Sequence, residues 1–223
     1  MTQTLLITGA SSGIGAATAR AAVKAGWQVA LLARSRDALE KLAAELGDAA
    51  LALPCDITER DQLSEAVAKT VERFGGLDAV YANAGKGSSS PGIEQGDPDD
   101  WHAMIHLNVL AVLNTAHATL PHLRKTKGHF VVTGSKAGRD HMKGSVYGAT
   151  KWFVQGLAGN LAEEMREWGG RCTLITPGMV DTPFFDEPKP DKIQPDDVAN
   201  AVVFALSQPR SADVREIHIM PSG

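Results

Sequence analysis

Tyr147 and Lys151 are the residues of this chain best suited to proton transfer. They lie in an apolar segment that predicts a helix over 146–168, where residues four apart share one face. A free tyrosine has a pKa of about 10, and a nearby ammonium favours its ionised form. Gly148 and Ala149 leave room beside the ring for a flat ligand. Such pairs also occur on solvated helix faces, so the spacing alone does not establish an acid–base site.

Two more polar residues occupy positions that suit the same site. Ser135 ends a predicted strand over 129–134, which places its hydroxyl at the carboxyl edge of a sheet. Asn108 lies in MIHLNVLAVLNTA, part of a strongly apolar helix predicted over 99–121, where a buried amide needs hydrogen-bond partners. Together with Tyr147, these residues form a candidate catalytic group.

A glycine-rich turn, TGASSGIG (8–15), separates the first predicted strand from the first predicted helix. Gly9, Gly13 and Gly15 remove side chains where backbone must approach a ligand and where helix packs on strand. The N-terminus of the helix offers free N–H groups and a positive dipole end to a phosphate. The GxxxGxG spacing fits the common GxGxxG dinucleotide pattern only loosely.

Arg34 follows the second predicted strand, where NAD-binding sheets carry an acidic residue for the ribose hydroxyls. A guanidinium there can hold a 2′-phosphate with paired hydrogen bonds, which predicts NADP(H) over NAD(H). Arg34 could instead be a plain surface residue at the strand end, and Asp37 lies nearby in sequence. Asp56, after the third predicted strand, suits an adenine contact or a turn. After the fourth predicted strand, Asn83-Ala84-Gly85 lets the backbone approach a cofactor.

Short apolar runs alternate with longer amphipathic stretches along the whole chain. Continuous apolar strands indicate burial on both faces, and the alternation predicts a parallel sheet between helices. We therefore expect an α/β fold: a single Rossmann-type domain over 1–223, with a seven-stranded parallel sheet and helices on both faces. The strands are expected at 4–8, 27–33, 50–54, 77–82, 129–134, 171–176 and 216–220, and one helix is expected to open at Thr58.

Two longer connections interrupt this rhythm, at 86–100 and 177–197. Both leave the carboxyl end of a strand, where ligands bind in open α/β sheets. The second carries Phe184 and Phe185 on an otherwise polar loop, so 177–197 is expected to be the substrate-loop region.

Composition narrows the class of protein. The 223 residues carry a net charge of −4 and no Lys/Arg block, so neither nucleic acid nor an anionic membrane is an expected partner. No targeting or spanning segment is evident, which makes a cytoplasmic location the expectation. Cys55 and Cys172 lie in apolar runs and are expected to be buried, reduced thiols. His102 and His106 lack companions for a metal site, and none is expected.

Taken together, TGASSGIG, NAG, Asn108, Ser135, Tyr147-x-x-x-Lys151 and the PG pair at 177–178 resemble the short-chain dehydrogenase/reductase family, in its NADP-preferring branch. The resemblance covers essentially the whole chain in the family's motif order. The sequence departs from the family where ANAG replaces a doubled asparagine, where the Ser-to-Tyr spacing is one residue short, and where EIHIMPSG replaces a final Asp-Gly-Gly.

The resemblance implies a role for each of four catalytic residues. Tyr147 would be the general acid in reduction and the general base in oxidation. Lys151 would lower the pKa of Tyr147 and hold the nicotinamide ribose. Ser135 would bind the substrate oxygen, and Asn108 would link Lys151 to solvent through water.

The resemblance also implies the cofactor and its contacts. NADP(H) would be bound by Tyr147, Lys151 and the residues Gly9, Ser11, Ser12, Gly13, Ile14, Gly15, Arg34, Asp56, Ile57, Asn83, Ala84, Gly85, Pro177, Gly178, Val180 and Thr182. The substrate would be a small carbonyl compound or alcohol, with hydroxy acids, ketones and aldehydes as candidates. The apolar helices over 99–121 and 146–168 suggest a homodimer or homotetramer. Two alternatives stay open: a non-enzymatic NADP(H)-binding regulatory or scaffold protein, and an epimerase or lyase with tightly held NADP.

Overall fold

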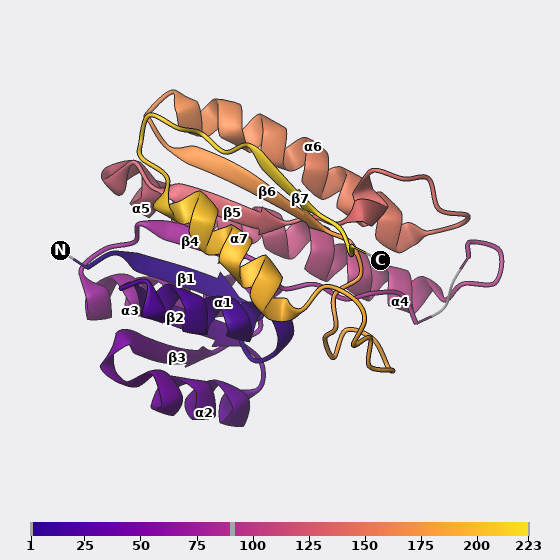
Figure 1. The fold of residues 1–223 in the computed structure, drawn as a ribbon, viewed down its shortest axis with the longest axis horizontal. Coiled ribbons are helices and arrows are strands. Elements are labelled where there is room, and N and C mark those ends of the chain that lie inside the picture. The colour runs from indigo at the N-terminus through magenta and orange to yellow at the C-terminus, as the bar shows by residue number, and fades with distance from the viewer. Residues whose placement is uncertain (1, 90–91, 223) are drawn as a thin grey trace.

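A seven-stranded parallel sheet forms the centre of the molecule in the computed structural model, which describes residues 2–89 and 92–222 (Figure 1). Its strand order, β3-β2-β1-β4-β5-β6-β7, reverses between β1 and β4, which is where ligands bind in such sheets. The predicted α/β fold is confirmed, and each strand lies within two residues of its expected position. The strands are β1 (Thr4–Thr8), β2 (Gln28–Ala33), β3 (Ala50–Pro54), β4 (Ala79–Ala82), β5 (His129–Thr133), β6 (Arg171–Pro177) and β7 (Glu216–Ile219).

Helices cover both faces of the sheet (Figure 1). Helices α1, α2 and α7 bury one apolar cluster, which includes Leu5, Leu31 and Val202, and α3, α5 and α6 bury the other, which includes Phe130 and Leu161. The sheet is thus buried on both sides, as its continuous apolar strands indicate. The helices are α1 (Gly13–Lys24), α2 (Arg36–Leu46), α3 (Arg60–Phe74), α4 (Pro98–Ile105), α5 (Ala111–Thr126), α6 (Val146–Arg166) and α7 (Pro195–Ser207).

The start of α3 differs from the sequence expectation. Thr58 was expected to open the helix, but its backbone N–H and its hydroxyl both donate to Asp56 Oδ1, at 2.9 and 2.7 Å. These bonds close a local turn, so the helix begins at Arg60 with Glu59 as a cap that makes no side-chain bond.

The helix from Pro98 runs on to Thr126, beyond the expected end at 121, and passes through Pro121. It contains a π-helical turn, η2 (His106–Leu110), and ends at Lys127 in the left-handed conformation with φ 51°. Its length of 29 residues and a mean hydropathy of 1.2 over its most apolar window would, by length and composition alone, suit a membrane span. In this fold Met104, Ala111 and Val112 of the helix are buried, and Ala111 and Val112 join the core cluster on one face of the sheet.

The two cysteines are buried and unpaired, as the apolar runs around them predict. Burial raises the pKa of Cys55 to about 11 and that of Cys172 to about 12, so neither is a ready thiolate.

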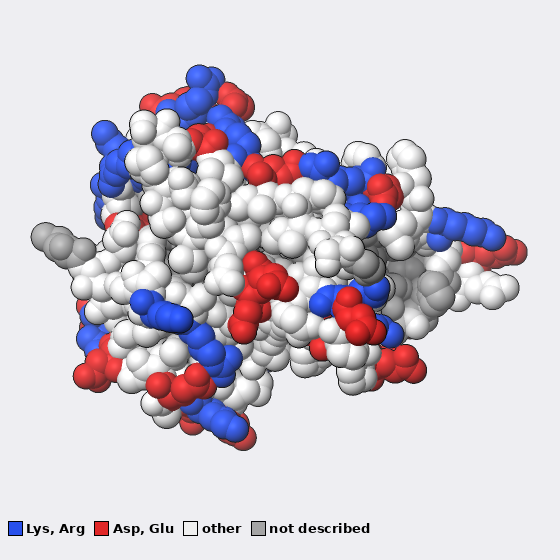
Figure 2. All heavy atoms as spheres, in the orientation of Figure 1, with Lys and Arg blue, Asp and Glu red and all other residues white. Residues whose placement is uncertain are grey.

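Charged side chains of opposite sign lie next to one another on the face shown in Figure 2. Several form exposed pairs within one helix, such as Lys69 with Glu65 at 2.6 Å on α3. Pairs of this kind contribute little to stability because water and salt screen them.

Beyond the helices and strands named above, the carboxyl ends of the strands carry a short 3-10 turn, η3 (Lys136–Gly138), and the described parts of two connections, 86–89 with 92–97 and 178–194. These segments project beyond the same edge of the sheet (Figure 1). Met1, Ser90, Pro91 and Gly223, which fall in the expected domain and in the expected loop at 86–100, lie outside the described residues.

His129 predicts an acid sensitivity of the fold. Its Nε2 lies 2.7 Å from Thr173 Oγ1, and burial lowers its pKa from 6.5 to about 3. A neutral buried histidine stabilises the fold fully above pH 6.5, and this contribution is lost as the pH falls toward 3. His129→Gln should remove up to about 1.4 kcal/mol per pH unit from the acid slope of unfolding free energy between pH 6 and 4.

Urea unfolding at a series of pH values measures this slope. His117→Gln, at an exposed position on α5, is the matched control and should leave it unchanged. Identical slopes for wild type and the His129 variant would contradict the assignment.

Candidate active site

Lys151 is the buried charge at the centre of the site, with 6% of the residue exposed. Its Nζ donates to the carbonyl oxygen of Thr133, the last residue of β5, at 2.8 Å. Burial lowers the pKa of Lys151 to about 8. The same Nζ lies 5.8 Å from the centre of the Tyr147 ring, one helical turn earlier on α6.

Tyr147 and Ser135 meet at the carboxyl end of β5. Burial raises the pKa of the Tyr147 phenol, and a hydrogen bond with Ser135 opposes this shift. Ser135 Oγ also accepts from Ala137 N at 3.1 Å, which fixes the hydroxyl at the start of η3. Burial is the larger effect on the pKa of Tyr147, and Ser135 is the group that opposes it. The expectation that Lys151 lowers this pKa stays a prediction. At neutral pH this phenol is protonated.

The glycine beside Tyr147 has a different role from the expected one. A Cβ on Gly148 would lie 3.2 Å from Ala137 O and 3.2 Å from Ser145 Oγ. The space beside Gly148 is therefore filled by the turn after Ser135, and the glycine lets α6 pack against that turn. The sequence suggested that Gly148 leaves room for a flat ligand, and the structure does not support that role.

Asn108 reaches the site from the π-helical turn η2, a distortion often found at functional positions. Its Oδ1 accepts from Lys86 N at 2.9 Å, and its Nδ2 donates to Lys86 O at 2.9 Å and to Thr150 Oγ1 at 3.1 Å. The amide is buried and fully partnered on its nitrogen, as a buried amide requires. Gly85 lies beside it, since a Cβ there would be 3.2 Å from Asn108 Oδ1 and 3.8 Å from Lys151 Nζ.

The glycine turn between β1 and α1 is shaped for close backbone approach. Gly9 has φ +67°, and a Cβ on it would lie 2.9 Å from Ala84 Cα. A Cβ on Gly15 would lie 2.2 Å from the Gly9 carbonyl oxygen, so only glycine fits there. Ser12 caps α1 without a side-chain bond, and the first turn has no acidic residue. The N–H groups of this helix end are thus available to a phosphate.

Asn83 ties the end of β4 to the glycine turn. Its side-chain Nδ2 donates to Thr8 O at 3.2 Å, and the backbone N–H groups of Asn83 and Ala84 donate to Thr8 Oγ1 at 3.0 and 3.1 Å. Thr133 Oγ1 donates to Asn83 Oδ1 at 3.2 Å, which joins β4 to β5. The Asn83 side chain serves the scaffold, and Gly85 is the exposed part of this segment.

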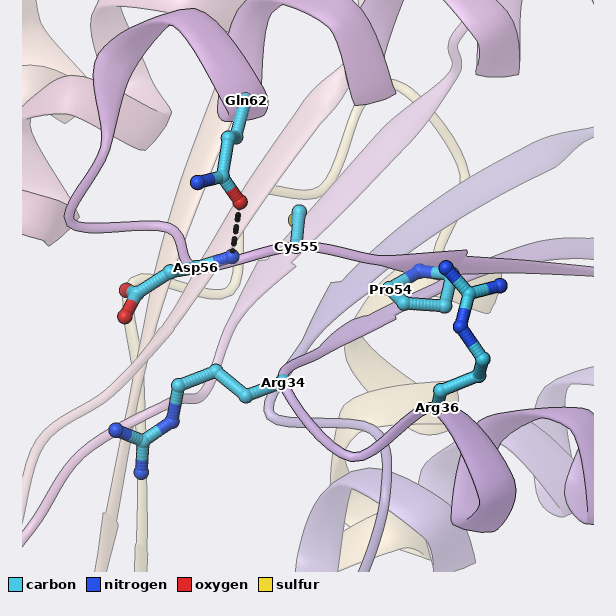
Figure 3. Close-up of a pocket in the computed structure, with 6 residues that line it drawn as sticks. All are labelled: Arg34, Arg36, Pro54, Cys55, Asp56 and Gln62. Atoms are coloured by element: carbon cyan, nitrogen blue, oxygen red, sulfur yellow. Dashed lines mark hydrogen bonds between the residues drawn. The ribbon is translucent and has the colours of Figure 1, made fainter.

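A cavity of about 280 Å³ lies between the ends of β2 and β3, lined by Arg34, Arg36, Pro54, Cys55, Asp56 and Gln62. Figure 3 shows the two arginine side chains extending in different directions from the segment after β2. Burial raises the pKa of Asp56, but the hydrogen bonds from Thr58 and the positive charge of Arg34 outweigh this effect and hold the pKa below its usual range. The Asp56 carboxylate makes the turn that was one of its two expected roles, and Gln62 Oε1 accepts from Asp56 N at 2.9 Å (Figure 3).

The segment after β6 lies across both halves of the site. A Cβ on Gly13 would lie 3.0 Å from Thr182 Cγ2, so Thr182 contacts the glycine turn. The Phe184 ring lies 5.7 Å from the Tyr147 ring and against Gly87. Val180 is buried in a core cluster and pairs with Ile193 in a short bridge.

Several predicted residues line the same edge without a polar side-chain contact. Gly178 N donates to Ile219 O at 2.8 Å, which ties the Pro177-Gly178 pair to β7. Ile57 is buried in the core cluster of the α3 face, and Ser11 and Ile14 are half-buried in the glycine turn.

The residues that sequence reasoning missed act through hydrogen bonds, most of which involve a backbone atom. Thr133 offers a backbone carbonyl to Lys151, Thr150 links Asn108 to the Tyr147 carbonyl, and Gln62 joins α3 to Asp56. Only Thr150 left a signal, as a hydroxyl three residues after Tyr147 on the same helix.

Comparison with known proteins gives the same picture. A family model described as short chain dehydrogenase matches residues 3–193. Serine 3-dehydrogenase of Agrobacterium fabrum is 36% identical over 99% of this chain and 94% of the relative. An uncharacterised oxidoreductase of Staphylococcus aureus is 37% identical over 97% of this chain and 96% of the relative.

Solved structures align over nearly the whole chain. An alcohol dehydrogenase from the archaeon Thermococcus sibiricus, complexed with 5-hydroxy-NADP, has a TM-score of 0.92 at 34% identity, over 100% of this chain and 97% of that chain. A 3-ketoacyl-(acyl-carrier-protein) reductase from Brucella melitensis, complexed with NADH, has a TM-score of 0.92 at 27% identity, over 99% and 97%. Both kinds of cofactor thus occur among similar structures.

Gly15 and Gly159 form a matched pair for testing the glycine turn. Gly15→Ala places a Cβ against the Gly9 carbonyl and should destabilise the fold by about 1–3 kcal/mol, with weaker nucleotide binding. Gly159→Ala, with open space on α6, should stabilise by about 0.5–1 kcal/mol. Thermal unfolding and nucleotide titration measure both effects; an unperturbed Gly15 variant would contradict the packing described.

Proposed function

This chain belongs to the short-chain dehydrogenase family, an enzyme family of oxidoreductases acting on CH–OH groups, and we propose that it interconverts a small alcohol and its carbonyl with NADP(H). The observation that carries the proposal is the meeting of Tyr147, Ser135 and Lys151 at the carboxyl end of β5. The relative named serine 3-dehydrogenase supports a small hydroxylated compound, such as a hydroxy acid, as one substrate candidate beside small ketones and aldehydes.

NADP(H) would supply hydride to the carbonyl carbon or accept it from the alcohol. The glycine turn fits its diphosphate because the first N–H groups of α1 are uncapped by a side chain. Gly85, beside Lys151 Nζ, leaves a surface without a side chain for the nicotinamide half. The cavity lined by Arg34 would receive the adenosine half and its 2′-phosphate.

Tyr147 acts in this scheme as the proton donor to the substrate oxygen during reduction. Its raised pKa keeps the phenol protonated at neutral pH, which suits the general acid. Ser135 donates a hydrogen bond to the same oxygen as negative charge develops there. In the oxidative direction Tyr147 must lose its proton, and the positive charge of Lys151 favours the phenolate as soon as solvent is excluded.

Lys151 holds its charge below a pH of about 8 and would bind the nicotinamide ribose hydroxyls. Asn108 and Lys151 both lie beside Gly85. Asn108 Oδ1 accepts one hydrogen bond, from Lys86 N, and so has one lone pair left. A water on that lone pair would connect Lys151 to solvent and restore the proton that Tyr147 gives away.

The segment 177–197 would form the substrate side of the pocket. Phe184 and Phe185 pack edge to face, with ring centres 5.3 Å apart, and the Phe184 ring lies 5.7 Å from that of Tyr147. A non-enzymatic function is not favoured, since the family's relatives are oxidoreductases and every chemical group of the site is present.

Self-association is part of the proposal. Helices α5 and α6 expose large apolar side chains that neither core cluster covers, including Leu113, Trp152 and Phe153, with Leu110 in the π-helical turn between α4 and α5. These surfaces would be buried in a homodimer or homotetramer.

The activity itself is tested with the wild-type chain. We expect turnover of NADPH with a panel of small ketones and aldehydes, and of NADP⁺ with alcohols and 3-hydroxy acids. The absorbance of NADPH measures both reactions.

The two tyrosines of the chain provide a matched pair of variants. Tyr147→Phe should lower kcat by about 100-fold or more, because the proton donor is lost, while NADPH binding stays nearly intact.

Tyr81→Phe is the control. The buried Tyr81 hydroxyl accepts from Thr133 Oγ1 at 2.8 Å. When the Tyr81 hydroxyl is removed, Thr133 Oγ1 can still donate to Asn83 Oδ1. This variant should retain most of the activity. Equal activity in both variants would overturn the role of Tyr147.

Cofactor choice is tested at Arg34. Arg34→Ala should lower the ratio of kcat/KM for NADPH over NADH by about tenfold or more, because a charge-assisted contact with the 2′-phosphate is lost. Arg166→Ala, on the exposed end of α6, is the control and should leave the ratio unchanged. A wild-type ratio near or below one would argue against the NADP(H) assignment.

A further inference from the structure

Asp100 is a buried carboxylate in α4, with 6% of the residue exposed. It accepts from Lys86 Nζ at 2.6 Å, from Ser88 Oγ at 2.9 Å and from Ser89 N at 3.0 Å. The ammonium of Lys86 and the two serines hold the pKa of Asp100 well below its usual range. A carboxylate with this set of partners fixes the segment that leaves β4 onto the start of the helix.

Lys86 is held at a second point by the same helix. Its backbone N–H donates to Asn108 Oδ1 and its carbonyl accepts from Asn108 Nδ2, both at 2.9 Å. Asp100 and Asn108 lie on one continuous helical segment, eight residues apart in sequence. One helix therefore binds the side chain of Lys86 through Asp100 and the peptide of Lys86 through Asn108.

The chain of contacts continues from Asn108 to the catalytic tyrosine. Asn108 Nδ2 donates to Thr150 Oγ1 at 3.1 Å, and Thr150 Oγ1 donates to Tyr147 O at 2.7 Å. Both protons of the Asn108 amide are used, so the orientation of the amide depends on where the Lys86 carbonyl stands. Asn108 Oδ1 and Lys151 Nζ both lie beside Gly85, since a Cβ on that glycine would be 3.2 Å from the first and 3.8 Å from the second.

We propose that the contact between Lys86 and Asp100 is a positioning device for Asn108. By fixing the Lys86 side chain it fixes the Lys86 peptide, and the peptide orients the amide that would hold the water beside Lys151. Lys86 and Asp100 are positioning residues that act through Asn108 and touch neither substrate nor cofactor. The proposal rests on the proposed function for its catalytic consequence, but its structural part stands on the hydrogen bonds alone.

Lys86→Met tests the device by removing the ammonium and keeping most of the apolar stem. We expect kcat to fall about tenfold while the dissociation constant of NADPH changes less than about twofold, because the amide loses its orientation and the cofactor site is untouched. Lys86→Arg should restore most of kcat, since a guanidinium can reach the same carboxylate. Lys69→Met, which removes the exposed pair of equal length on α3, is the matched control and should leave kcat unchanged.

A double-mutant cycle with Asn108→Ala separates positioning from general stability. If Lys86 acts through Asn108, the double variant should turn over no more slowly than Asn108→Ala alone. Multiplicative losses in kcat, or a Lys86→Met variant with wild-type kcat, would overturn the proposal. A loss confined to thermal stability would also overturn it.

Hydrogen exchange gives a readout that needs no turnover. The backbone N–H of residue 86 donates to Asn108 Oδ1, which protects it from exchange with solvent. The exchange of this N–H should be faster in Lys86→Met, in Asp100→Asn and in Asn108→Ala. Unchanged exchange in the first two variants would overturn the proposal. Absence of turnover in the wild type would instead refute the proposed function and leave this result to decide on the positioning device alone.

Discussion

The buried ammonium of Lys151 is the constraint on which the rest of the site depends. A charge removed from water is costly unless polar groups replace its hydration, and here the Thr133 carbonyl supplies the direct bond while no carboxylate of the described residues is bonded to it. This arrangement requires the end of β5 and the first turns of α6 to lie in contact. Gly138, in the η3 turn that follows β5, allows this turn to pack on α6, because a Cβ on it would lie 2.5 Å from the Lys151 carbonyl oxygen. An ammonium has three N–H donors and Thr133 O takes one of them, so this group can still bind a further polar ligand.

The sequence was sufficient to predict the sheet because its strands are short continuous apolar runs between amphipathic helices, and burial on both faces leaves such a pattern. It was less sufficient at helix ends. Threonine is a common helix cap, yet the N–H and the hydroxyl of Thr58 both donate to the Asp56 carboxylate. Whether these bonds form depends on the conformation of the turn between the two residues, which the sequence does not reveal. The π-helical turn at Asn108 left no trace either, since one extra residue per turn blurs a helical pattern without replacing it.

The predicted catalytic residues do converge in the structure, since Ser135, Tyr147, Lys151 and Asn108 all lie near the carboxyl end of β5. What the sequence could not provide is the electrostatic balance between them. A Tyr–Lys spacing suggests an acidified phenol, but the degree of burial decides the sign, and burial is a property of the assembled fold. Contacts through backbone atoms were also invisible, because Thr133 offers its carbonyl and Lys86 its peptide, and neither requires a particular side chain.

The loop after β6 joins the two halves of the site. Thr182 lies beside Gly13 of the glycine turn, and the ring of Phe184, two residues later, lies 5.7 Å from the ring of Tyr147. Because so short a piece of chain separates the two side chains, a displacement of Thr182 would also displace Phe184. A mechanical connection thus runs from the first turn of the sheet edge to the tyrosine through two residues of backbone.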